Sequence, residues 1–317
     1  MRTLIVKSVK VILVLIVVYF VGRQLSGNWD AVRLHDWTIN WWLLALSIIS
    51  HLVTFVLFSQ VWRFLISGMG QNVPLRYAFK LAYMVNLGRY IPGKVWHVIG
   101  MAYLARQIRI KEEVAVASWG LAMLFALPSA FMAGLFCMLF LPELRQMSQF
   151  MGVGFMVTIG ITIALSIGLI VAPNRSLGLF NRLLRLFKRS EVHFQLKTSV
   201  AIMVYVGYFC CWLAYGFSFW LFILSVAGDV DLPVLAGVGT FVIAYQIGYL
   251  AVFSPAGIGV RELILTTLLT PYLGPVATGL AVASRLWNLV AEIVAALIAW
   301  RIRFREQKTE DFNSLDD

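Results

Sequence analysis

The 317-residue chain is 61% hydrophobic and 13% charged, a composition that excludes a soluble globular protein. Its formal net charge of +11 is compatible with nucleic-acid binding, but the basic residues stand at the ends of apolar segments, as the positive-inside rule predicts for membrane proteins. We therefore expect a polytopic membrane protein with no nucleic-acid partner. The three cysteines lie inside apolar runs and give neither a disulfide framework nor a metal-ligand spacing, so we expect no metal and no other cofactor.

Long apolar runs predict about six full transmembrane helices, at residues 11–22, 39–66, 114–141, 152–172, 199–226 and 275–300. Residues 1–306 then form one transmembrane domain and residues 307–317 a short polar tail. The strongly basic loop 174–197 is expected to face the cytoplasm, which places both termini inside a bacterial inner membrane. Within this loop, residues 177–187 have apolar side chains at helical spacing. They indicate either an amphipathic helix on the anionic inner leaflet or a topology determinant alone.

Two further apolar segments, 75–107 and 232–273, are interrupted by proline and glycine at residues 86–96 and 254–262. Proline lacks a backbone donor and glycine permits positive φ, so the helix is expected to break at both places. The exposed backbone groups must be buried in protein or line a wet cavity. The surrounding charges predict that the first segment enters from the cytoplasm and the second from outside. Whether 232–253 spans or re-enters stays open.

The expected fold is thus all-α, with about six full transmembrane helices plus two re-entrant or broken helical hairpins in inverted orientation. Paired interruptions of this kind are typical of transporters whose substrate lies near the bilayer midplane. The first break supplies four candidate substrate-binding residues: Arg89, Pro92, Gly93 and Lys94. The second break supplies Pro255, Gly257, Gly259, Arg261 and Glu262.

The last predicted helix carries Arg285, Asn288 and Glu292, spaced three and four residues apart and therefore on one helix face. We expect that face to point into the bundle and Glu292 to pair with Arg285 or Arg261. The remaining guanidinium would bind a phosphate, whose oxygens fit the arginine fork. The alternative for Glu262 and Glu292 is a structural ion-pair lattice. His51 in the second span is either a helix contact or part of a proton relay.

Three motifs carry a resemblance: Arg-x-x-Pro-Gly at 89–93, Pro-x-Gly-x-Gly-x-Arg-Glu at 255–262, and Arg-x-x-Asn at 285–288. Together they resemble the transmembrane domain of the lysylphosphatidylglycerol synthase family, the flippase-like region of the multiple peptide resistance factor. The resemblance implies movement of a phospholipid across the bacterial inner membrane. Lys94 stands where many relatives have a second glycine, which leaves the substrate open. The polar stretches are too short for a lysine-transferring domain, so we expect no enzyme activity.

Three functions remain open from the sequence. The first is a flippase for an anionic phospholipid or a lipid-linked substrate, which would pass through a polar cleft between the two hairpins. The second is a non-transporting partner of a lipid or polysaccharide synthase. The third is a membrane-embedded glycolipid transferase, for which we find Glu262 and Glu292 but no acidic pair and no nucleotide-binding loop.

Overall fold

The computed structural model of the chain describes residues 37–86, 96–108, 110–139, 142–175, 195–228, 230–251 and 257–304, together with the single residues 33 and 178. Every helix of eight or more residues in these ranges is an α-helix, and the ranges contain no strand, which confirms the predicted all-α class. The α-helices are α3 (Trp41–Gly68), α4 (Leu75–Asn86), α5 (Trp96–Gln107), α6 (Glu112–Met138), α7 (Pro142–Val171), α9 (Thr198–Ala227), α10 (Val234–Leu250), α11 (Val260–Leu273) and α12 (Ala277–Arg301).

Several of these helices are long and apolar enough to cross a membrane. In the described residues they are Trp41–Gly68, Val114–Met138, Thr198–Ala227 and Val260–Arg301, with shorter apolar helices at Val157–Val171 and Val234–Leu250. The last long stretch is two helices, because Gly274 adopts φ +56° and a 3-10 turn, Gly274–Val276, separates α11 from α12. The protein is therefore a multi-pass membrane protein. The predicted span at 11–22 and the amphipathic segment 177–187 are not among the ranges described.

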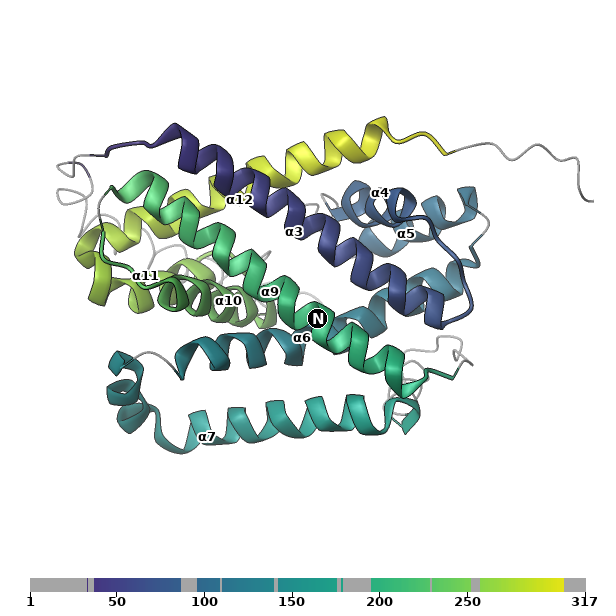
Figure 1. Ribbon diagram of the computed structural model, residues 1–317, viewed down its shortest axis with the longest axis horizontal. Helices are drawn as coiled ribbons and strands as arrows, with labels where there is room; N and C mark the ends of the chain where they lie inside the picture. Colours follow the sequence, from purple (N-terminus) through teal and green to yellow (C-terminus); the bar gives the residue numbers. More distant parts are fainter. Residues whose placement is uncertain are drawn as a thin grey trace, which may run out of the picture.

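Helices α3 and α9 form an antiparallel pair that runs the length of the bundle (Figure 1). At one end the backbone N–H of Asn40 donates to the carbonyl of Ser225 at 2.8 Å. At the other end a Cβ on Gly68 would meet Val200 at 2.9 Å. Small residues let apolar helices approach closely where no hydrophobic effect drives them together. The end at which α3 finishes is therefore the end at which α9 begins.

The α4–α5 pair belongs to the end at which α3 finishes. Helix α4 follows α3 after a short turn, and α5 leads back to the start of α6. There Trp62 Nε1, near the end of α3, donates to Ser118 Oγ near the start of α6 at 3.1 Å. Helix α4 ends at Asn86 and α5 begins at Trp96. The predicted break at residues 86–96 falls between them, and residues 87–95 lie outside the described ranges.

The α10–α11 pair belongs to the opposite end. Helix α10 follows the end of α9, and α11 leads to α12, whose Trp287 Nε1 donates to Ser47 Oγ near the start of α3 at 3.1 Å. Figure 1 shows α4 and α5 toward one end of the long helices and α10 and α11 toward the other. The two helix pairs thus belong to opposite ends of the long helices. That they re-enter the membrane in inverted orientation stays a prediction.

Helix α12 connects the two regions. It packs against α11 near its beginning and against α4 further along. At its end Lys80 Nζ donates to the carbonyl of Ile302, and the Tyr77 and Phe304 rings lie 5.2 Å apart. Helix α12 therefore contacts one helix of each pair, α11 and α4.

Candidate functional site

The break between α10 and α11 is held by glycines that no other residue can replace without strain. Gly257 adopts φ +68° and Gly259 φ +83°, values in the left-handed region that the sequence predicted for this segment. A Cβ on Gly257 would lie 2.7 Å from the carbonyl oxygen of Gly248 on α10. The chain thus folds back tightly on α10 before α11 begins at Val260.

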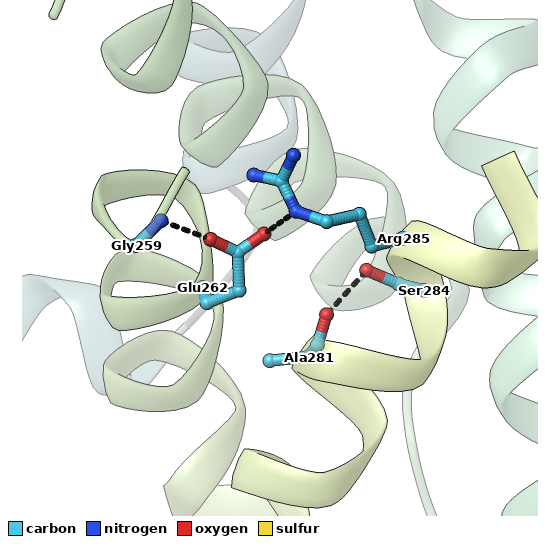
Figure 2. Close-up of polar contacts among 5 residues, drawn as sticks. All are labelled: Gly259, Glu262, Ala281, Ser284 and Arg285. Atoms are coloured by element: carbon cyan, nitrogen blue, oxygen red, sulfur yellow. Dashed lines mark hydrogen bonds and ion pairs between the residues drawn. The ribbon is translucent and has the colours of Figure 1, made fainter. Parts of the chain in front are cut away.

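Glu262 fixes the beginning of α11 to α12. Its Oε2 accepts a hydrogen bond from the backbone N–H of Gly259, and its Oε1 accepts one from Arg285 Nε at 2.7 Å (Figure 2). A glutamate at the third helical position that reaches back to the N-cap is half of a capping box; glycine has no side chain to supply the other half. The negative charge also suits the positive end of the helix dipole. These contacts support the structural alternative for Glu262.

This pairing differs from one sequence-based interpretation. We expected Glu292 to pair with Arg285 or Arg261, but the ion pair of Arg285 is formed with Glu262. Glu262 follows a tight glycine turn that brings its side chain across to α12. Spacing along α12 alone could not reveal that contact.

Arg261 is buried without a counter-charge. It is 5% exposed, and its Cζ lies 5.0 Å from the centre of the Phe241 ring and 5.2 Å from that of Tyr245. Its Nε and Nη2 are buried and form no hydrogen bond, and no carboxylate among the described residues forms an ion pair with it. Cation–π contacts are worth about 0.5–2 kcal/mol, whereas burying an ion costs several kcal/mol. The rings alone therefore do not compensate the charge of Arg261.

A second polar group lies further along α12. Tyr215 on α9 donates its hydroxyl hydrogen to Asn288 Oδ1, and Asn288 Nδ2 donates to Glu292 Oε1 at 2.6 Å. All three side chains are buried. The predicted common face of Asn288 and Glu292 does point into the bundle, and Arg285 shares it with a side chain that is 27% exposed.

His51 lies in an aromatic environment beside this group. Its ring centre is 4.4 Å from that of Phe55, 4.7 Å from that of Tyr215 and 4.4 Å from that of Trp287. The residue is fully buried and joins α3, α9 and α12. This packing favours the helix-contact interpretation of His51.

Residues 7–299 match the family described as the lysylphosphatidylglycerol synthase TM region. The chain belongs to this family. The resemblance drawn from the three motifs is thereby confirmed, and the matched range contains all three. No curated protein matches the chain.

In this member of the lysylphosphatidylglycerol synthase TM family, the candidate residues fall into three sets. Gly257, Gly259, Arg261, Glu262 and Arg285 come together where α10, α11 and α12 meet. Asn288 and Glu292 form the second set, on the same helix as Arg285 and closer to its C-terminal end. The remaining candidates lie outside the described residues: Arg89, Pro92, Gly93, Lys94 and Pro255.

The aromatic partners of Arg261 were not predicted. Phe241 and Tyr245 are four residues apart on α10, so they share one face and form a single surface for the guanidinium. In an apolar helix such a pair is indistinguishable from ordinary packing residues. Two features of the sequence could have indicated this contact. One is the four-residue spacing of Phe241 and Tyr245, and the other is that Arg261 has no acidic residue on its own helix face.

Proposed function

We propose that this protein translocates an anionic phospholipid or lipid-linked substrate across the bilayer. The observation that supports the proposal is that two helix pairs, α4–α5 and α10–α11, belong to opposite ends of the bundle, and that α11 carries the buried Arg261 in its first turn. Broken helices in inverted halves place polar backbone and helix ends near the middle of a membrane protein, where a substrate head group needs them.

In this proposal both hairpins re-enter the membrane and form a polar cleft between them. The head group occupies the cleft while its acyl chains stay in the lipid. Arg261 neutralises the phosphate together with Arg89 and Lys94 of the first break. The proline and glycine residues of the two breaks interrupt the helices and free backbone polar groups for the substrate: Pro92, Gly93, Pro255, Gly257 and Gly259. Four polar side chains stabilise the helices that line the cleft: Glu262, Arg285, Asn288 and Glu292.

The distribution of charge supports an orientation for this transport. Basic residues gather at the end at which α3 finishes, on the termini of α4, α5, α6, α9 and α12: Arg76, Lys80, Arg106, Lys111, Lys197, Arg301 and Arg303. The acidic Asp231 lies at the other end, before α10. By the positive-inside rule we assign the basic end to the cytoplasm of a bacterial inner membrane.

Reconstitution tests the proposal. The purified protein is placed in vesicles that contain a trace of head-group-labelled anionic phospholipid, and a membrane-impermeant quencher reports how much label reaches the outer leaflet. We expect protein-containing vesicles to move the label faster than protein-free vesicles. Equal rates in both would contradict the proposal. If the rates are equal and a synthase co-purifies in stoichiometric amount, the protein is better explained as a non-transporting partner of that synthase. If the protein alone converts labelled lipid into a product, it is better explained as a transferase.

A further inference from the structure

The chain leaves α12 as a short extended strap, Ile302–Phe304, that lies against α4. Ile302 has φ −71° and ψ 111°, and its backbone N–H closes the last turn of the helix. Ile302 and Phe304 are half-buried against the core. The alternate residues Arg301 and Arg303 are exposed. This alternation is that of an extended segment with one face on the protein. Figure 1 shows this end of α12 running over α4, against which α12 packs.

Lys80 on α4 has both of its polar contacts with the strap. Its Nζ donates to the carbonyl of Ile302 and lies 4.3 Å from the centre of the Phe304 ring. No carboxylate among the residues that the structure describes forms an ion pair with Lys80. Because a half-buried ammonium has lost part of its water, it needs such partners. If the strap leaves α4, Lys80 loses both contacts at once.

A pair of aromatic rings joins the strap to the same face of α4. The ring centres of Phe304 and Tyr77 lie 5.2 Å apart with an interplanar angle of 66°, the edge-to-face geometry that aromatic pairs prefer. Tyr77 and Lys80 are three residues apart and therefore neighbours on the helix surface. The strap thus contacts α4 through a hydrogen bond, a cation–π contact and a ring pair. Few, half-buried contacts of this kind open at a lower free energy than the core.

The far end of α4 is anchored in a different way. The Tyr83 ring stacks on that of Phe55 of α3, with ring centres 4.5 Å apart. Helix α4 ends at Asn86, where the first predicted break begins. The strap therefore acts on the half of α4 that is farther from the break. Loss of the strap contacts would loosen the beginning of α4 while the Tyr83 contact still holds its end.

We infer that the strap is a reversible restraint on α4, which holds the first helix pair in the position seen here and frees it to move when the strap is released. The chain continues from the strap into the polar residues 305–317, so the C-terminal segment acts on α4 through the strap. The consequence for transport rests on the proposed function. There the first break supplies Arg89 and Lys94 to the head group, and the strap has to open for that break to move.

Hydrogen–deuterium exchange of the purified protein in detergent tests the restraint. Phe304→Ala removes both ring contacts, and Lys80→Met removes the ammonium but keeps an unbranched side chain. In each variant we expect the amides of α4 to exchange about tenfold faster than in wild type, because the lost contacts shift the opening equilibrium by about that factor. The amides of α9 should exchange at wild-type rates. Trp300→Ala is the matched control and should change neither helix, because Trp300 is 67% exposed near the end of α12.

The exchange pattern decides between a local restraint and general stabilisation. Faster exchange confined to the α4–α5 pair supports the inference. Unchanged exchange of α4 in Phe304→Ala would overturn it. Equal acceleration of α4 and α9 would also overturn it, because the strap would then stabilise the whole bundle.

A reducible cross-link tests the role of the strap in transport. Tyr77→Cys and Phe304→Cys are introduced together in a protein that lacks the three native cysteines, and a short thiol-reactive linker that dithiothreitol cleaves joins them. We expect the linked protein in vesicles to lose nearly all translocation and dithiothreitol to restore it. Each single-cysteine variant treated with the linker should keep its rate.

The outcomes separate this inference from the proposed function. Translocation that is equally fast with the linker in place would overturn the role of the strap in transport. If the exchange of α4 responds as expected but the protein moves no lipid, linked or unlinked, the translocation proposal fails and the restraint on α4 stands.

Discussion

Glu262 on α11 and Arg285 on α12 form an ion pair at 2.7 Å, and the same carboxylate caps the start of α11 at Gly259. Because Glu262 contacts these two partners, the neighbouring Arg261 is buried against aromatic rings and forms no ion pair with a carboxylate of the described residues. The ion pair of Glu262 is therefore formed with Arg285 and not with its sequence neighbour Arg261.

The Glu262–Arg285 pair should contribute measurably to stability. We expect Glu262→Ala to lower the free energy of unfolding by about 2–4 kcal/mol, because it leaves Arg285 without its ion-pair partner and removes a helix cap. A double-mutant cycle with Arg285→Gln, followed by denaturant unfolding in detergent, measures the coupling. The exposed Arg106–Glu112 pair is the matched control, with side chains 70% and 37% exposed, and its cycle should give less than about 1 kcal/mol. Equal coupling in the two cycles would contradict a stabilising role for Glu262.

The tight turn at Gly257 should tolerate no side chain. Gly257→Ala combines left-handed strain of about 1–3 kcal/mol with a clash against the Gly248 carbonyl. Gly274→Ala serves as the control, because Gly274 also has positive φ but a Cβ there would meet no atom within 4 Å. We expect the Gly257 variant to have the lower melting temperature of the two. Indistinguishable melting curves would mean that the close approach of the two arms is not needed.

The Tyr215–Asn288–Glu292 group should act as a unit. Asn288→Leu removes the acceptor of the Tyr215 hydroxyl and the donor to Glu292, which should cost about 1–3 kcal/mol of stability for each buried group left unsatisfied. Tyr215→Phe in the same background should then cost less than it does in wild type. Thermal unfolding of the two single variants and the double variant measures this coupling. Strictly additive losses would show that the Tyr215–Asn288 hydrogen bond contributes nothing to stability.

Orientation can be tested with single cysteines. In a background that lacks Cys137, Cys210 and Cys211, we expect Asp231→Cys to react with a membrane-impermeant thiol reagent added to intact cells. Arg303→Cys should react only after the membrane is permeabilised. The reverse pattern would overturn the assignment of the basic end to the cytoplasm.

Much of the fold was predictable because helix breaks and charged helix ends have strong local signals. The Pro/Gly interruptions predicted both helix pairs, and four of the predicted spans have close counterparts in α3, α6, α9 and α12. Helix α7 begins at Pro142, well before the predicted residue 152, because a polar first turn can extend a helix beyond its apolar stretch.

The ion-pair partners within the site were less predictable. A spacing of three or four residues reports contacts along one helix, whereas Arg285 finds its carboxylate on another helix after a glycine turn. The aromatic surface under Arg261 likewise depends on how α10 packs against α11. Such contacts are set by tertiary structure, and residue types alone do not determine them.

The central claim is that Arg261 takes part in lipid translocation. The most direct measurement is the rate of head-group-labelled phospholipid movement in vesicles containing wild type, Arg261→Ala or the control Arg106→Ala, whose arginine is exposed near the end of α5. Equal protein incorporation and melting temperature would establish that each variant is folded. We predict that Arg106→Ala translocates at the wild-type rate and that Arg261→Ala falls to the rate of protein-free vesicles. A folded Arg261→Ala protein that translocates as fast as wild type would contradict the claim.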